Sequence, residues 1–406
     1  MKYFLLCCFL SGVLLANAQR IPDIGMKNAD KIDVPFELEN NFIIISVIFN
    51  RVFPLKFIVD TGAEYTILTH KEITDLLQID YHREFPILGA DMKTELKGYL
   101  ARGIDLQIGG MLASQRTILV LDDDYFRFNE LAGIEVHGIL GADLLRRFVV
   151  RINYQKKVIT FFDPGHFPEP RQATVLPIDV YRNKPYINVD VGMQEKNLDS
   201  LKMLIDTGAS LALLVHTGTL PGFETPANVV PGNIGMGLGG FLEGYNGRMD
   251  FIDIGPHRLR GVITNFQDFL PGANPELINQ RNGIVGNQVL ERFNVTFDYI
   301  REKLYLVPNR HFNDRFRFDK SGMALVASGV RLGEIVVLSV IPGSPADEVG
   351  ILPGDHIKTF NGFSTRLFSL GDIVYRLSGR TGKRIRLNII RDEVKFKVTF
   401  RLRDLI

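Results

Sequence analysis

The chain has 406 residues, of which 46% are hydrophobic and 23% charged, so it can bury a core and is long enough for two or three domains. Its 47 Lys and Arg residues nearly balance 46 Asp and Glu, and this balance excludes the strongly basic surface typical of nucleic-acid-binding proteins. We therefore expect a folded globular protein with no nucleic-acid partner.

Residues 1–18 have the pattern of a secretory signal peptide. After a positively charged start, residues 3–15 form an apolar run too short to span a bilayer, and Ala-Asn-Ala ending at Ala18 is a typical cleavage site. We expect cleavage after Ala18 and a secreted or periplasmic protein. Cys7 and Cys8 would leave with this segment, and the mature chain would have no disulfide. We expect no membrane-spanning segment, because no later stretch is apolar for long enough.

Strand patterns and breakers divide the rest of the chain. Residues 19–33 are polar without a clear period and are expected to form a tether. Residues 164–173, rich in proline and glycine, predict a linker between two β-rich lobes at 34–163 and 174–310. A different pattern predicts a third unit at 318–406.

One motif occurs once in each lobe: an apolar strand followed by an acid, a threonine and a glycine. The copies are Phe57–Ala63 and Met203–Ala209. Three consecutive large apolar side chains indicate a buried strand, so Asp60 and Asp206 each fall at a strand end. The glycines that follow, Gly62 and Gly208, allow a sharp turn directly after the acid.

We expect the two acidic loops to face each other. The hydroxyls of Thr61 and Thr207 could hydrogen-bond to the partner loop, while Ala63 and Ala209 leave room for it. Two carboxylates in contact cannot both ionise, so they would share one proton. The charged carboxylate could then take a proton from water while the protonated one donates to a peptide carbonyl, which is the chemistry of amide hydrolysis.

Each acid is followed at nearly equal distance by a second matching segment. Gly138–Gly141 corresponds to Gly283–Gly286, and the match continues through residues 144–154 and 289–299. Repetition of this length indicates a duplicated unit. His70 and His216 also occupy equivalent positions, which we interpret as helix starts. No cysteine or paired histidine lies near them, so we expect no metal and no other cofactor.

Together with the repeat, the two Asp-Thr-Gly-Ala segments resemble the aspartic peptidases, and the alanine resembles the retroviral type more than the pepsin type. One copy alone would be explained by a turn with a capping Asp. The resemblance implies a mainly β fold with two tandem retropepsin-like β-barrel lobes and a catalytic pair formed by Asp60 and Asp206. Two lobes on one chain favour a monomer. The resemblance implies that the catalytic loops are supported by Thr61, Gly62, Ala63, Thr207, Gly208 and Ala209.

The resemblance also implies substrate-binding positions. Retroviral enzymes carry an acid after the motif that holds the substrate backbone, which corresponds here to Glu64, with Ser210 in the second copy. The alternative for Glu64 is a solvated loop acid.

Two segments occupy the places of flaps that close over a substrate. The first contains Gly89 and Ala90, for which an ordinary hairpin turn is the alternative. The second is the glycine-rich segment 232–247, with Gly237 and Gly239. Its spacing, and the lack of a strand-turn-helix context, argue against a dinucleotide fingerprint.

The third unit has the pattern of an α+β domain. Ser344 and Pro345 predict the start of a helix, and a second helix is expected near Leu370–Leu377. The run from Pro342 to Gly362 resembles the PDZ domains of bacterial envelope proteases. PDZ domains add a peptide strand to a sheet edge, and a glycine-containing loop holds the terminal carboxylate. We place that loop at Gly322-Met323-Ala324-Leu325 and expect it to bind C-terminal peptides.

The sequence thus predicts an exported aspartic endopeptidase that acts on peptide or protein substrates. Because Ala63 and Ala209 lack a hydroxyl that pepsin-type enzymes direct at the carboxylates, activity should extend to weakly acidic pH. The alternative is a non-catalytic peptide-binding protein with degenerate lobes. A scaffold that uses only the PDZ domain would leave the duplicated acids unexplained.

Overall fold

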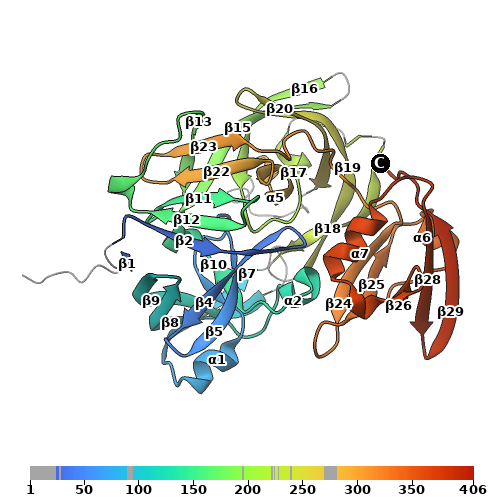
Figure 1. Ribbon diagram of the computed structural model, residues 1–406, viewed down its shortest axis with the longest axis horizontal. Helices are drawn as coiled ribbons and strands as arrows, with labels where there is room; N and C mark the ends of the chain where they lie inside the picture. Colours follow the sequence, from blue (N-terminus) through green and yellow to red (C-terminus); the bar gives the residue numbers. More distant parts are fainter. Residues whose placement is uncertain are drawn as a thin grey trace, which may run out of the picture.

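The fold is mainly β, as predicted, and its strands form four sheets (Figure 1). The computed structural model describes residues 24–26, 29–88, 95–193, 196–220, 223, 225–226, 228–237, 240–268 and 281–406. The predicted signal peptide, Gly89, Ala90 and Gly239 lie outside these residues. No helix in the described ranges is long and apolar enough to cross a membrane.

The first lobe is built on one sheet in the order β1-β9-β6-β10-β5-β4-β8-β7, with β3 beside β4. Its strands are β1 (Ile24–Met26), β3 (Glu37–Glu39), β4 (Phe42–Phe49), β5 (Phe53–Val59), β6 (Ile67–Leu68), β7 (Tyr81–Leu88), β8 (Glu95–Ile108), β9 (Met111–Leu121) and β10 (Gly138–Leu140). Its helices are α1 (Lys71–Leu76), α2 (Phe128–Ala132) and α3 (Ala142–Leu145).

The second lobe repeats this plan in a sheet ordered β14-β15-β16-β21-β17-β20-β19-β18. Its strands are β14 (Asp179–Tyr181), β15 (Lys184–Met193), β16 (Lys196–Ile205), β17 (Leu213–His216), β18 (Val230–Gly237), β19 (Gly240–Ile254), β20 (His257–Gln267) and β21 (Gly283–Val285). The short helices are η2 (Thr217–Thr219) and α5 (Asn287–Leu290).

A third sheet, ordered β13-β23-β22-β11-β12-β2, joins the two lobes. At its centre β11 pairs antiparallel with β22, and Arg151 lies opposite Thr296, its equivalent in the repeat. Equivalent strands that pair in this way place the lobes about an approximate two-fold axis. The elements are β2 (Lys31–Pro35), β11 (Val149–Asn153), β12 (Val158–Phe162), η1 (Pro164–His166), β13 (Thr174–Pro177), β22 (Phe293–Asp298) and β23 (Lys303–Pro308).

The tether expected over residues 19–33 is wrong for the part that the structure describes. Residues 24–26 pair with β9, and β2 pairs with β12, with Ile32 opposite Phe161. Ile32 and Val34 alternate with polar residues, and Val34 is buried in the core of the lobes. This alternation is too short to be distinguished from a polar loop in the sequence alone.

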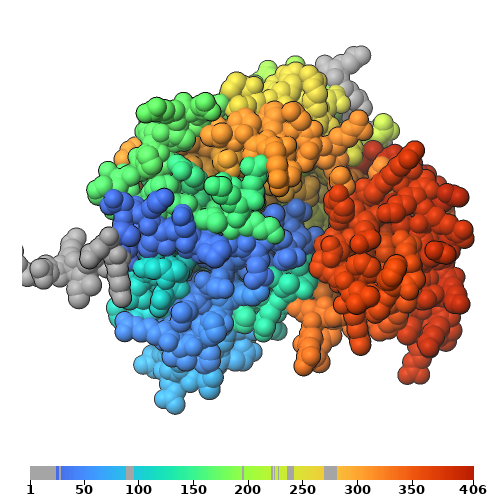
Figure 2. Space-filling model, in the orientation of Figure 1, coloured from blue at the N-terminus to red at the C-terminus, as the bar shows by residue number. Residues whose placement is uncertain are grey.

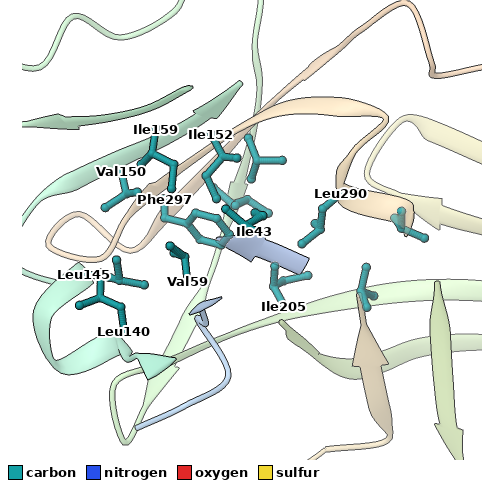
Figure 3. Close-up of a cluster of buried hydrophobic side chains, with 14 of the residues drawn as sticks. Ile43, Val59, Leu140, Leu145, Val150, Ile152, Ile159, Ile205, Leu290 and Phe297 are labelled. Carbon is teal, nitrogen blue, oxygen red and sulfur yellow. The ribbon is translucent and has the colours of Figure 1, made fainter. Parts of the chain in front are cut away.

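The strands that carry the two acids are anchored in one hydrophobic core. Val59 ends β5, Ile205 ends β16, and both are completely buried in a cluster that includes Phe297 of the shared sheet (Figure 3). Close packing of this kind leaves little freedom for either strand end. Both acidic loops therefore start from fixed points.

The C-terminal domain has its own sheet, ordered β24-β25-β26-β28-β29 with β27 beside β26, and its own core. It forms a distinct body beside the lobes (Figure 2). The predicted helix at Leu370–Leu377 is confirmed, and Ser369 and Asp372 form a capping box at its start. The elements are β24 (Met323–Ser328), β25 (Glu334–Val340), α6 (Pro345–Glu348), β26 (His356–Phe360), β27 (Phe363–Ser364), η3 (Thr365–Leu367), α7 (Leu370–Leu377), β28 (Arg384–Arg391) and β29 (Val394–Arg401).

Candidate active site

Each acidic loop is supported from below by the apolar segment that ends in glycine. β10 pairs parallel with β5, and β21 pairs parallel with β16 in the same register. A Cβ atom on Gly138 would overlap the carbonyl of Ile67, and one on Gly283 would overlap the carbonyl of Leu214. Only glycine permits these close approaches, which explains why both copies begin with it.

The two loops are joined by reciprocal hydrogen bonds between their threonines. The backbone N–H of Thr61 donates to Oγ1 of Thr207 (3.0 Å), and that of Thr207 donates to Oγ1 of Thr61 (3.1 Å). The hydroxyls donate in turn to backbone carbonyls, Thr61 to Ile205 (2.7 Å) and Thr207 to Val59 (2.8 Å). Both threonines are buried, so these four bonds fix the loops without competition from water.

This arrangement brings the two carboxylates together. Oδ1 of Asp60 accepts from the N–H of Gly62 (2.7 Å) and of Ala63 (3.0 Å), and Oδ1 of Asp206 accepts from the N–H of Gly208 (2.8 Å). A Cβ atom on Gly62 would lie 2.5 Å from Cγ of Asp206, and one on Gly208 would overlap the carboxylate of Asp60. Each carboxylate therefore lies against the glycine of the opposite loop.

The contact between the two carboxyl groups favours a single shared proton. Burial, the charge of Asp206 and a hydrogen bond between the two carboxyl groups raise the pKa of Asp60 well above the ordinary value, although the amides of Gly62 and Ala63 oppose this shift. Lys184 and Arg281 both interact electrostatically with Asp206. Burial lowers the pKa of each, and the negative charge of Asp206 opposes that shift in both.

The loop of the second lobe has an additional support, Asn287, which the sequence analysis did not identify. Asn287 is buried, and its Nδ2 donates to the carbonyls of Thr207 (2.5 Å) and Asn41 (2.9 Å). Its Oδ1 accepts from the hydroxyl of Tyr154 (2.7 Å). Its place directly after Gly286 is the signal that could have identified it.

The first lobe lacks this support. The equivalent of Asn287 is Ala142, and the buried hydroxyl of Tyr299, the equivalent of Tyr154, has no hydrogen-bond partner among the described residues. Burial, with the charges of Asp60 and Asp206, raises the pKa of Tyr299. Instead, Thr66 accepts from the N–H of Gly141 (3.2 Å) and donates to Asp143 (2.8 Å). The two loops are thus held by different side chains.

Glu64 and Ser210 lie where the lobes meet. Nδ2 of Asn183 donates to the carbonyl of Glu64 (3.3 Å), and Nδ2 of Asn41 donates to the carbonyl of Ser210 (3.3 Å). Both asparagines belong to hairpin turns of the opposite lobe. The structure therefore places Glu64 and Ser210 at contacts between the two lobes, and their role in substrate binding stays a prediction.

The predicted flaps correspond to two hairpins. β7 pairs with β8 on either side of residues 89–94, which lie outside the described residues. β18 pairs with β19, where Gly237 lies opposite Gly240. The role of residues 89–90 and 239 in substrate binding thus stays a prediction.

Of the four residues expected at the carboxylate-binding loop, three lie in a strand, and their role in peptide binding stays a prediction. Met323, Ala324 and Leu325 lie in strand β24, because Met323 and Leu325 point into the domain core as alternate residues of a strand. Only Gly322 belongs to the loop, where it has a positive φ of 84°. The loop amides before the strand are those of Ser321 and Gly322.

No group of three or more His, Cys, Asp or Glu side chains that could hold a metal ion occurs in the part of the chain that the structure describes. His70 and His216 precede α1 and η2, as expected for helix starts. His216 is buried, which lowers its pKa to about 3.

Comparison with known protein families gives matches in the first lobe and in the C-terminal domain. Residues 45–144 match the family model described as aspartyl protease, and residues 336–391 match the PDZ domain model. The two matches support an aspartyl protease with a PDZ domain.

Two curated relatives are the carboxy-terminal processing proteases CtpA and CtpB of Bacillus subtilis (strain 168). They are 37% identical over 59 residues and 31% identical over 75 residues, which is 14% and 18% of this chain. The chain spans only 13% and 16% of the length of these relatives.

Two solved structures show a distant likeness. Basic 7S globulin from soybean has a TM-score of 0.40 and 10% identity, covering 69% of this chain and 97% of that one. An aspartic proteinase from Irpex lacteus has a TM-score of 0.42 and 13% identity, covering 70% and 99%.

Proposed function

We propose that the protein is an aspartic endopeptidase that hydrolyses peptide bonds with the pair Asp60 and Asp206. The observation that carries this proposal is the contact between the two carboxylates, each seated on the glycine of the opposite loop. Burial and the charge of Asp206 raise the pKa of Asp60, which favours a pair that shares one proton and so supplies an acid and a base side by side.

In the proposed reaction, ionised Asp206 takes a proton from water, whose oxygen attacks the peptide carbonyl carbon. Asp60 gives its proton to the carbonyl oxygen, which yields a tetrahedral diol. The diol collapses when Asp206 passes its proton to the amide nitrogen and the C–N bond breaks. A hydroxyl proton of the diol returns to Asp60 as the new carboxyl group forms, which restores the starting state.

The test is cleavage of denatured casein across acidic and neutral pH, with and without a statine-type inhibitor. Asp60→Asn and Asp206→Asn should each lower kcat/KM by about 100- to 10,000-fold, because each removes one proton-transfer group. Asp80→Asn, the same change at an exposed acid, is the control and should cleave normally. Full activity in either dyad variant would contradict the shared site, and binding of peptide without any cleavage by wild type would favour the non-catalytic alternative.

We further propose that peptide or protein substrates reach the protein outside the cytoplasm, after cleavage following Ala18, and that the protein acts as a monomer. The N-terminal pattern and the tandem lobes support these two statements. N-terminal sequencing of exported protein tests the first, and sedimentation tests the second. We also propose that the PDZ domain takes C-terminal peptides, the general ligand of a sheet edge that follows a glycine-containing loop.

A further inference from the structure

The PDZ domain has a groove between strand β24 and helix α7, which we call the PDZ groove. β24 is the edge strand of its sheet within the described residues, and α7 lies along it. An edge strand beside a helix is where a PDZ domain adds a peptide strand. Figure 1 shows both elements on the side of the domain that faces the protease lobes, whereas β28 and β29 lie on the far side.

Helix α2 of the first lobe covers this groove. It lies against β24, and Val326 in that strand is only 5% exposed although it is not part of the PDZ core. At the end of α2, a Cβ atom on Gly133 would lie 2.9 Å from Cβ of Leu370, the first residue of α7. The helix therefore contacts both the strand and the helix that line the groove.

The carboxylate end of the groove is occupied as well. Oδ1 of Asp319 accepts from the N–H groups of Ser321 (2.9 Å) and Gly322 (2.6 Å), the amides that directly precede β24. In this position a PDZ domain holds the terminal carboxylate of its ligand. A side-chain carboxylate of the chain itself thus takes the hydrogen bonds that a peptide C-terminus would need.

The PDZ domain also contacts the second lobe. Strand β25 lies against β18, the first strand of the predicted glycine-rich flap. Beyond these contacts a cavity of about 1430 Å³ separates α7 from the lobes. Arg260, Arg315 and Arg380, which are all exposed, line it. Docking therefore combines contacts at α2 and β18 with the packing of Ile406 against the core of the lobes, and the cavity leaves the rest of this face open. Motion between domains is the general expectation for an interface of this kind.

We propose that the chain itself closes its PDZ groove, with Asp319 in the place of a ligand carboxylate and α2 across the strand edge. A peptide C-terminus can enter only if the PDZ domain leaves α2, so peptide binding and docking exclude each other. Because the same movement separates β25 from β18, a bound peptide also releases the flap hairpin of the second lobe. The inference rests on the proposed function only in taking this domain as a peptide site.

Gly371 in α7 offers a way to undock the domain without changing its core. A Cβ atom there would meet Ser369 Oγ at 3.8 Å and the backbone N of Asn40 in the first lobe at 3.9 Å. Alanine therefore fits, while the side chain of Gly371→Trp would extend into the turn that holds Asn40. Gly371→Ala is the matched control, and it favours the helix slightly.

The experiment measures binding of a fluorescein-labelled decapeptide ending in Val-Ala-Leu with a free carboxylate. The full chain carries Asp206→Asn so that the probe is not cut. Gly371→Trp should bind the probe at least about tenfold more tightly than Gly371→Ala, because the docking energy no longer opposes binding. Asp319→Ala should also bind more tightly, and the gain should be lost when the probe ends in an amide.

Hydrogen exchange gives a second measurement that does not depend on these substitutions. In the chain with no substitution in the PDZ domain, the probe should speed amide exchange in α2 and β18. Gly371→Trp should speed the same exchange without any probe. Equal affinity in all variants, binding without a change in α2, or no binding even to Gly371→Trp with Asp319→Ala would each overturn the inference. None of these outcomes depends on catalysis, so a failure of the proposed peptidase activity would be seen separately in the casein assay.

Discussion

The reciprocal threonine bonds allow a quantitative test of how the two acidic loops are held. Thr207→Val keeps the shape of the side chain but removes the hydroxyl that accepts from the N–H of Thr61 and donates to the carbonyl of Val59. Each buried backbone group left without a partner costs about 1–3 kcal/mol, so the substitution should cost about 2–6 kcal/mol. Thr61→Val breaks the other two bonds and should cost the same.

Hydrogen exchange of the β5 and β16 amides measures this cost in the lobes without interference from the PDZ domain. Thr207→Ser retains the hydroxyl and should recover most of the loss. Thr399→Val, the same change on the exposed face of β29, should lie within about 0.5 kcal/mol of wild type. If Thr207→Val cost no more than Thr399→Val, the four bonds would not hold the loops together.

Three further predictions concern single buried groups. The folded-state pKa of Asp60 is raised above its ordinary value of 3.8, so stability is lost as pH rises through the raised pKa. Asp60→Asn should therefore exceed wild type in unfolding free energy at neutral pH but not below pH 3.8, and pH-independent thermal melts would contradict this. Asn287→Ala leaves the Tyr154 hydroxyl without its acceptor. It should lower the local stability of the second acidic loop, measured by amide hydrogen exchange, by about 2–4 kcal/mol, and kcat should fall more than KM rises. Asp355→Ala strips a fully buried carboxylate from Arg391 and should destabilise the PDZ domain by about 3–5 kcal/mol, seen as an earlier melting step while the lobes melt unchanged.

Features set by neighbouring residues could be predicted from the sequence. Helix α7 begins after Ser369 because that side chain caps it, and its bounds follow from this local signal. Strand β4 (Phe42–Phe49) is an apolar run of the expected length, interrupted only by Ser46. The meeting of Asp60 and Asp206 could be expected because the motif is repeated, and repetition is visible without any structure.

Features that depend on distant contacts could not be predicted. The position of Asn287 directly after Gly286 is visible in the sequence, but its role depends on the convergence of Tyr154, Asn41 and Thr207, which no local pattern indicates. The loop expected at Gly322 extends no further because Met323 and Leu325 are needed by the domain core. Likewise, nothing in the sequence of α2 indicates that it covers the PDZ groove.

The pairing of Arg151 with Thr296 across the shared sheet has a consequence for how this protein could change over time. In a symmetric homodimer, every substitution appears twice, so a residue that suits one side must also suit the other. Here the two halves are covalently joined, and each can accept a substitution alone. Two such one-sided differences occur at equivalent positions of the repeat: Asn287 corresponds to Ala142, and Ser210 corresponds to Glu64. The joined chain can thus assign a different chemical environment to each acid, which an exact dimer cannot do.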